Sequence, residues 1–330
     1  MKHKNIAIFV PHAGCPHKCS FCNQHAITAQ DALPRAADVQ RICAKASAEI
    51  SNCRNTEVAF FGGSFTAIPR DYMLELLKAV QPFLGENGFC GIRISTRPDC
   101  ISRGVLDILK MYGVTAIELG AQSMCDHVLA ANDRGHTAQD VADACTLIRE
   151  YGFELGLQVM VGLYKSTMED ERRTLQEIRK IHPDTVRIYP TAVLQNTPLA
   201  DKLKSGEYQL FSFDEVTAFC AEMLSQFAAD GIAVIKCGLH ASEFVAQDCV
   251  GGFYHPAFRE LCEGVLFRRR MTELLGECGR EQAVFAVHPS CISKAVGHKR
   301  ANILHFQSVG TAVKIIGDEN LDEYQIELRE

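Results

Sequence analysis

The sequence contains no long hydrophobic run. No stretch reaches the roughly 18 consecutive apolar residues that a membrane-spanning helix needs. Near the N-terminus, only the segment from Ile6 to Val10 is uninterrupted and apolar, and it is too short for the core of a signal peptide. We therefore expect a cytoplasmic protein with no membrane segment.

The chain also lacks an excess of positive charge. Its formal net charge is −6 at pH 7. This balance excludes a globally basic surface for nucleic acid, but a local basic patch is compatible with it. Basic side chains gather in two C-terminal segments, and a solvated helix face is the alternative reading of both. They are Arg268, Arg269, Arg270, Lys294, Lys299 and Arg300.

No linker rich in Pro, Gly or Ser divides the first 235 residues, and what fills them is a regular alternation. Short apolar runs predict strands, and amphipathic segments between them predict helices. The expected strands are residues 5–11, 57–63, 90–96, 116–122, 154–162, 185–191 and 232–238. Strands that alternate with helices form a parallel sheet, because only a crossover returns the chain in the same direction. We therefore predict an α/β fold, with a partial or complete parallel (β/α) TIM-type barrel.

The alternation fades after about residue 238. Residues 251–275 follow, and then come three short pieces that we read as strand-like, "QAVFAVHP", "NILHF" and "TAVKIIG". We predict a barrel over residues 1–238 and a small C-terminal α+β subdomain over residues 239–330.

The 15 cysteines cannot all pair, and thiols stay reduced in the cytoplasm, so a disulfide framework is the weakest interpretation. Most of them stand singly in apolar contexts, which is typical of small buried side chains. A C-terminal group leaves an auxiliary cluster open, although its gaps are long and irregular and buried thiols are the preferred reading. It consists of Cys237, Cys249, Cys262, Cys278 and Cys291.

The segment "GCPHKCSFCNQ" is different, because Cys15, Cys19 and Cys22 lie in one loop after the first strand. With His25 as a fourth ligand, they could close a structural zinc site. Alternatively, they could hold a [4Fe–4S] cluster with one iron left open, since such clusters take cysteine thiolates. The segment "GGSFT" and two further motifs follow the next three strands, so all four would meet at one face of a parallel barrel. That position favours the cluster over a structural zinc site.

The cysteine loop, with Phe21 before its last cysteine, resembles the signature loop of radical SAM enzymes. The segments "FFGGSFTAIP", "STRPDCI", "ELGAQSM", "NDRGHT" and "RIYPTAVLQNTPLADKLKSGEY" resemble the radical SAM half of the Elongator catalytic subunit. The resemblance runs from about residue 9 to 208. It implies that S-adenosylmethionine (SAM) chelates the open iron and is reductively cleaved to a 5′-deoxyadenosyl radical.

The resemblance also implies roles for single residues. Contacts to the SAM amino group would come from the motif after the second strand, which contains Gly62, Gly63, Ser64 and Thr66. Gln122 would be a polar SAM contact, Arg134 would pair with the SAM carboxylate, and Phe21 would pack near adenine. Ser95 stands where we expect a glutamate, so a carboxylate that could bind ribose hydroxyls is missing at that position. No catalytic residue is assigned beyond these cofactor contacts.

The predicted function is therefore that of a radical SAM enzyme that abstracts hydrogen from an organic substrate. A tRNA or other RNA base is the leading candidate substrate, because the relatives implied by the resemblance act on tRNA. The resemblance further implies a reductant such as flavodoxin or ferredoxin. The acetyltransferase domain of the Elongator subunit has no recognisable counterpart in this sequence. The alternative is a non-catalytic, zinc-containing RNA-binding module that uses Cys15, Cys19, Cys22 and His25.

Overall fold

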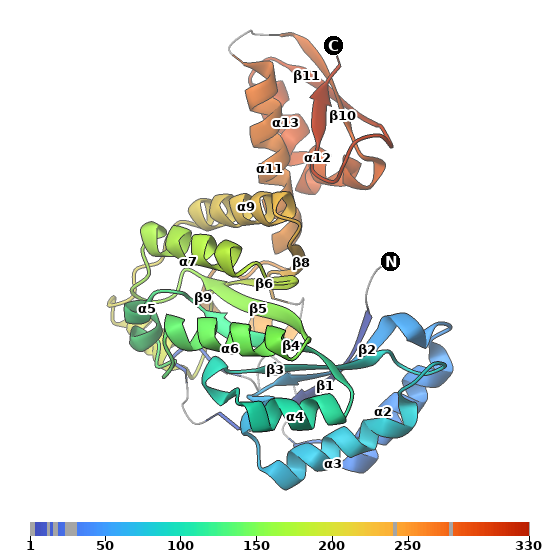
Figure 1. Ribbon diagram of the computed structural model, residues 1–330. Helices are drawn as coiled ribbons and strands as arrows, with labels where there is room; N and C mark the ends of the chain where they lie inside the picture. The colour runs from blue at the N-terminus through green and yellow to red at the C-terminus, as the bar shows by residue number, and fades with distance from the viewer. Residues whose placement is uncertain are drawn as a thin grey trace.

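The computed structural model describes residues 4–11, 14–15, 19–23, 32–239, 243–276 and 280–329. Within them, a seven-stranded sheet has the order β1-β2-β3-β4-β5-β6-β8, and all of its neighbouring strands are parallel. The strands are β1 (Lys4–Val10), β2 (Thr56–Gly62), β3 (Gly91–Thr96), β4 (Val114–Gln122), β5 (Glu154–Val161), β6 (Thr185–Pro190) and β8 (Ala233–Cys237). The sheet is a curled half-barrel, and β1 does not pair with β8 in the described part (Figure 1). The predicted α/β class is confirmed, and of the two predicted forms the barrel is the partial one.

Helices cover the outer face of this sheet (Figure 1). They are α2 (Ala36–Glu49), α3 (Arg70–Val80), α4 (Arg103–Met111), α6 (Ala138–Glu150), α7 (Met168–Ile181) and α9 (Phe213–Ala229). Two shorter helices, α5 (Asp126–Ala131) and α8 (Pro198–Lys204), lie in the connections that follow β4 and β6. Capping boxes begin α6 at Thr137, α7 at Thr167 and α9 at Ser212. Each fixes where its helix starts after a strand, so the loops at the strand ends have defined lengths.

Successive side chains of a strand point to opposite faces of the sheet. In β3, Ile92 and Ile94 are fully buried apolar residues, whereas the alternating Arg93 and Ser95 are buried and polar. In β3, apolar side chains therefore pack between the sheet and its helices, and polar ones face the inside of the half-barrel.

The inner face carries a buried network of charges. Arg93 of β3 donates from Nε to Glu57 Oε2 at 2.7 Å and from Nη1 to Glu118 Oε1 at 3.4 Å. Glu118 also accepts from Arg187 of β6, at 2.6 Å from Nε and 2.9 Å from Nη2. Glu154 accepts from Arg93 Nη2 at 2.7 Å. The network ties β2, β3, β4, β5 and β6 together across the inside of the sheet.

A smaller unit follows the last strand of the barrel. A short pair of strands, β7 (Ala192–Leu194) and β9 (Cys249–Gly252), joins the two parts of the chain, and α10 (Glu243–Asp248) precedes β9. Helix α11 (Phe258–Leu275) then leads to a three-stranded sheet of order β11-β10-β12. Its elements are β10 (Gln282–Val287), α12 (Ile292–Val296), α13 (Ala301–Ser308), β11 (Ala312–Gly317) and β12 (Ile326–Leu328). The division of the chain after residue 238 stays a prediction.

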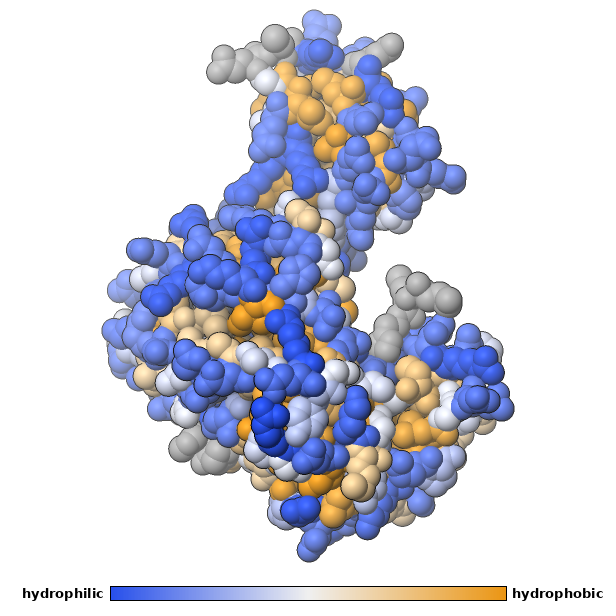
Figure 2. Space-filling view, in the orientation of Figure 1, coloured by the Kyte–Doolittle hydropathy of each residue, from blue (hydrophilic) through white to orange (hydrophobic). Residues whose placement is uncertain are grey.

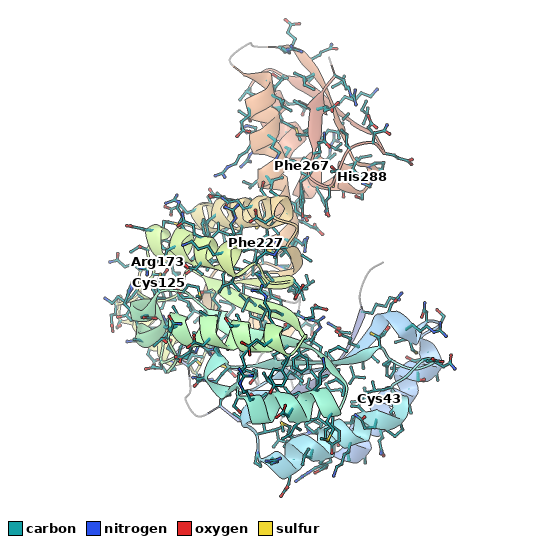
Figure 3. All side chains as sticks on the ribbon, in the orientation of Figure 1. Cys43, Cys125, Arg173, Phe227, Phe267 and His288 are labelled. Carbon is teal, nitrogen blue, oxygen red and sulfur yellow. The ribbon has the colours of Figure 1, made fainter. Side chains whose placement is uncertain are left out.

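The unit around this second sheet stands away from the barrel in the space-filling view (Figure 2). In the same view, the surface is hollowed between this unit and the part of the barrel near the N-terminus. Phe267 of α11 lies in the unit, and Phe227 of α9 lies in the helical layer of the barrel (Figure 3). None of the described helices combines the length and apolar character needed to cross a lipid bilayer.

One sequence-based assignment in this unit is wrong. The segment "NILHF", residues 302–306, lies in helix α13 and not in a strand. Ile303 and Phe306 are both buried, three residues apart, which is the spacing of one helix face. The run is short enough to fit either period, so the sequence alone could not separate helix from strand there.

The inner network generates a stability prediction. The substitution Arg93→Met should lower the free energy of unfolding by roughly 3–5 kcal/mol, because the buried Glu57 loses its bond to the guanidinium and the buried Glu118 keeps only Arg187. Chemical denaturation under anaerobic conditions measures this loss. The control Arg41→Met removes an exposed pair with Asp38 and should cost less than about 0.5 kcal/mol. Equal losses in the two variants would contradict the prediction.

Candidate functional site

The cysteine loop packs directly against the loop that follows β2. Gly14 has a φ of +72°, and a Cβ atom on it would lie 2.6 Å from Ile68 N. Cys15 Sγ lies 3.8 Å from Ser64 Oγ. Within the loop, Cys22 N donates to Cys19 O at 3.1 Å. The absence of a side chain at position 14 therefore lets the two loops touch.

The ends of β1 and β2 also meet through their backbones. Gly62 has a φ of +113°, a conformation that favours glycine. A Cβ atom there would lie 2.9 Å from Val10 O. The next residue, Gly63, donates its N–H to the same Val10 carbonyl at 2.9 Å. The paired glycines thus serve a close backbone approach in this structure.

Hydroxyl groups connect the ends of β2 and β3. Thr66 Oγ1 lies 2.6 Å from Thr96 Oγ1 and donates to Cys100 O at 2.8 Å. Ser95 accepts a hydrogen bond from Gln158 Nε2 at 3.0 Å. The hydroxyl proton of Thr66 is therefore used inside the protein, while Ser95 is held toward the inside of the half-barrel.

Arg134 joins the cysteine loop to the end of β4. It donates from Nη1 to Cys19 Sγ at 3.1 Å and from Nη2 to Gly120 O at 2.6 Å. Its Nε has no hydrogen-bond partner among the described residues, and neither does Oε1 of Gln122, which has a φ of +68°. Both side chains are buried. Buried polar atoms without partners are costly, and a hydrogen-bonding ligand beside these two atoms would remove that cost.

His136 is a buried neighbour that the sequence did not single out, although it lies in the quoted motif "NDRGHT". Its ring nitrogen Nε2 is 3.2 Å from Ala121 O, and since a carbonyl oxygen only accepts, Nε2 carries the proton. Burial, and then the charge of Arg134, lower the pKa of His136 to about 4. The ring is neutral at physiological pH, and Nδ1 lacks a partner in the described part of the chain.

A cavity of about 490 Å³ opens at the carboxyl ends of the strands. Its lining includes five residues that the sequence predicted for the site, namely Phe21, Cys22, Gly62, Ser95 and Gln122. The other predicted residues lie around it without lining it, namely Cys15, Cys19, Gly63, Ser64, Thr66 and Arg134. The four motifs that follow β1 to β4 therefore converge, as expected for the ends of parallel strands.

The remaining wall of the cavity was not predicted. It includes Gln158, Met160, Arg187, Tyr189 and Lys236, from β5, β6 and β8. The sequence did contain a signal for this wall, because Gln158 and Arg187 are polar residues within largely apolar strands. Each lies two residues before a second lining residue, Met160 or Tyr189, and residues two apart share one face of a strand. None of the described residues that line the cavity is acidic.

The two cations of this wall have different surroundings. Arg187 is bound by both oxygens of Glu118, and its Cζ lies 4.9 Å from the centre of the Phe61 ring. Lys236 forms no ion pair with any described residue. Burial, and then the positive charge of Arg187, lower the pKa of Lys236. A negatively charged or electron-rich group in the cavity would offset the repulsion between the two cations.

Other residues singled out in the sequence lie elsewhere. Cys237, Cys262 and Cys291 are buried, Cys249 is half-buried, and Cys278 and His25 fall outside the described residues. As they stand, the described side chains form no group of three His, Cys, Asp or Glu that could hold a metal ion. The preferred interpretation as buried thiols agrees with these positions.

Comparison with known proteins identifies the family. Residues 9–178 match the radical SAM superfamily, and residues 183–267 match the radical SAM C-terminal domain. The chain belongs to the radical SAM superfamily and is a radical SAM enzyme. Members of this family typically bind a [4Fe–4S] cluster and SAM. The comparisons give no support to the alternative of a zinc-containing module.

Among curated proteins, the chain is similar to the tRNA uridine(34) acetyltransferase of Dehalococcoides mccartyi. They are 26% identical over 252 residues, or 66% of this chain and 55% of the relative. It is also 30% identical to the human Elongator complex protein 3 over 190 residues, or 51% of this chain and 35% of that protein. The chain thus spans about half or less of the length of these relatives.

Two solved structures share the fold. The archaeal Elp3 of Methanocaldococcus infernus superposes with a TM-score of 0.65 at 19% identity, over 82% of this chain and 63% of that chain. The coproporphyrinogen III oxidase of Escherichia coli superposes with a TM-score of 0.52 at 19% identity, over 70% of this chain and 54% of that chain. At this identity the likeness concerns the fold alone.

His136 generates a prediction about pH. Its folded-state pKa of about 4 lies below the ordinary value of 6.5, so its contribution to stability is complete above pH 6.5 and is lost as the pH falls toward 4. Between pH 7.5 and 5, the wild type should lose about 2 kcal/mol more of its unfolding free energy than the variant His136→Gln. Urea denaturation of both proteins at the two pH values measures the difference. Equal losses would show that His136 is not held neutral by burial.

Proposed function

We propose that Cys15, Cys19 and Cys22 hold a [4Fe–4S] cluster and that the adjoining strand ends hold SAM. The observation that carries the proposal is the cavity, whose wall brings Cys22 together with Gly62 and Gln122. The donor set fits, because three thiols leave one loop and thiolates are the usual ligands of such clusters. The partnerless Gln122 Oε1 and Arg134 Nε also fit a polar ligand beside that loop.

Each residue of the strand ends then has a task in binding. Gly62 and Gly63, without side chains, would let backbone carbonyls approach the SAM ammonium group. Arg134 would offer Nε to the SAM carboxylate, while Nη1 and Nη2 stay on Cys19 and Gly120. Ser64 and Thr66 would support the glycine loop from behind, and Phe21, which lines the cavity, would pack against adenine.

When bound, the cluster supplies the electron that cleaves the sulfonium of SAM, and a flavodoxin- or ferredoxin-type reductant would deliver that electron to it. The protein's own contribution is to orient SAM and to shield the reaction from water, as is general for enzymes whose cofactor carries the chemistry. Ser95, held by Gln158, offers a hydroxyl where a carboxylate was expected. The ribose would therefore be bound by a neutral group.

The substrate would occupy the end of the cavity formed by β5, β6 and β8. We propose that it is an RNA base. The similarity to a protein named as a tRNA uridine(34) acetyltransferase supports this class. The cations Arg187 and Lys236, in a wall without acidic residues, suit an electron-rich carbonyl or a phosphate better than a positively charged group.

The experiment for this function compares 5′-deoxyadenosine formation from SAM with and without RNA. The anaerobically purified protein is reconstituted with iron and sulfide and reduced, and total RNA is then added. Product that increases with RNA, with deuterium moving from labelled RNA into it, would support an RNA base as the substrate. Product that is indifferent to RNA would remove the RNA base, and no product from an intact cluster would remove the whole proposal.

A cysteine pair tests the cluster ligands. Cys19→Ala should abolish both the visible absorbance of the cluster and SAM cleavage, because one of three thiolates is lost. Cys43→Ala is the matched control, since Cys43 is buried in α2 on the outer layer, away from the cavity (Figure 3). It should keep absorbance and cleavage. Cleavage that survives in Cys19→Ala would contradict the assignment.

A lysine pair tests the substrate end. Lys236→Met should reduce the RNA-dependent increase in 5′-deoxyadenosine at least about tenfold, because a hydrogen bond from a charged donor contributes roughly 1.5–3 kcal/mol. The control Lys314→Met removes an exposed lysine of β11 and should keep the increase. An undiminished increase in Lys236→Met would place the substrate elsewhere.

A further inference from the structure

The small C-terminal unit contains a loop between two helices that the radical SAM chemistry does not use. Its order is strand β10, helix α12, loop, helix α13 and strand β11, and the two strands are parallel neighbours. The loop runs from Gly297 to Arg300. It lies beyond residue 267, where the family matches end.

We propose that this loop holds the sugar–phosphate backbone of a single-stranded nucleic acid. KH modules clamp about four nucleotides of a single strand with a four-residue loop of the form G-x-x-G. The loop here has the same length and begins with Gly297. Arg300 takes the place of the last glycine and has a left-handed backbone with a φ of +63°.

The loop is fixed against the rest of the unit. Asn302 is buried and donates from Nδ2 to Gly264 O at 2.8 Å and to Ala295 O at 2.9 Å. A Cβ atom on Gly297 would lie 3.0 Å from the Asn302 side chain. Arg300 N donates to Gly297 O at 2.9 Å. The loop is therefore held in one shape, and a ligand would not have to order it.

Existing hydrogen bonds and ion pairs limit which basic residues of this unit could bind phosphate. Arg270 donates to Tyr324 O and to Ser225 Oγ, and Lys294 pairs with Glu263 and Glu323 at 3.2 and 2.9 Å. These two cations are therefore already bonded within the protein. By contrast, Lys299 and Arg300 are exposed and form no ion pair with any described residue. Two free cations on a rigid loop suit successive phosphates.

An apolar surface lies next to these cations. Leu304 is 57% exposed in the first turn of α13, which begins at Ala301, the residue after Arg300. Bases of a strand held at its phosphates would contact Leu304. This apolar contact favours a single strand, whose bases are open, over a duplex, whose bases are stacked inside.

The loop also lies on the side of the unit that leads to the cavity. The ring centroids of His298 and His255 are 5.6 Å apart. His255 follows β9, which pairs with β7, and Ala192 and Leu194 of β7 line the cavity. The idea that a base of the bound strand reaches the cavity rests on the proposed function. The idea that the loop binds a nucleic acid is independent of it.

The test is fluorescence anisotropy of the full chain with a fluorescein-labelled single-stranded RNA dodecamer. The double variant Lys299→Gln/Arg300→Gln should bind at least about tenfold more weakly than the wild type. The slope of log affinity against log salt should fall by about 1.4, or roughly 0.7 for each lost phosphate contact. Arg280→Gln/Lys314→Gln is the matched control, because it removes two exposed cations of the same unit. It should bind like the wild type.

The outcomes separate the inference from the proposed function. Wild-type affinity in the loop variant, an equal loss in the control, or tighter binding of duplex RNA would overturn the inference. Equal affinity for a DNA dodecamer would support contacts to phosphate alone, and preference for RNA would add a contact to the 2′-hydroxyl. SAM cleavage without RNA is measured separately. Its failure would remove the proposed function and leave the binding result standing.

Discussion

The buried charge network inside the half-barrel is the interaction on which the rest of the structure depends. Glu118 accepts from Arg93 on β3 and from Arg187 on β6, so a single carboxylate joins strands that are not neighbours in the sheet. Buried charges are costly unless they are paired and hydrogen-bonded. Both guanidinium groups reach this carboxylate on the concave face of the sheet, so the charge network and the curl of the sheet occur together. Curvature in turn brings the strand ends onto one cavity.

The two sides of the cavity at the carboxyl ends of the strands differ in which atoms shape the wall. On the side of β1 to β4, close backbone contacts shape the wall. Gly14 and Gly62 permit these contacts, which a side chain would block. On the side of β5 to β8, side chains define the wall, with Gln158, Arg187 and Lys236 projecting from strands. A site for a constant cofactor and a site for a specific substrate are expected to differ in this way, since backbone geometry tolerates little change.

Much of the fold could be predicted from the sequence, and the reason is periodicity. Strands buried by helices appear as continuous apolar runs, so all seven strands of the main sheet were located. The motifs at strand ends were also recognisable, because glycines and cysteines are conspicuous after such runs. The segment "NILHF" failed because five residues are too few to distinguish a period of two from one of 3.6.

The inner wall could not be predicted for a different reason. Whether Arg187 faces the cavity depends on the direction in which the sheet curls, and its partner Glu118 is 69 residues away in the sequence. His136 was missed because its neutrality results from burial and from Arg134, which only the fold brings into place. These properties arise from tertiary contacts, whereas periodicity reports local structure.

One helix relates the C-terminal loop to the cavity. At its first turn, Arg259 of α11 donates to Val234 O of β8 at 2.8 Å, two residues before Lys236. Farther along the same helix, Gly264 O accepts from Asn302, which pins the loop. The loop and the cation of the cavity are thus held at the two ends of a short, rigid segment of helix. Phosphate contacts generally position a nucleic acid, and other contacts read its bases. With the backbone held at Arg300 and the base presented toward Lys236, affinity and chemistry would come from different parts of the fold, so either could change without loss of the other.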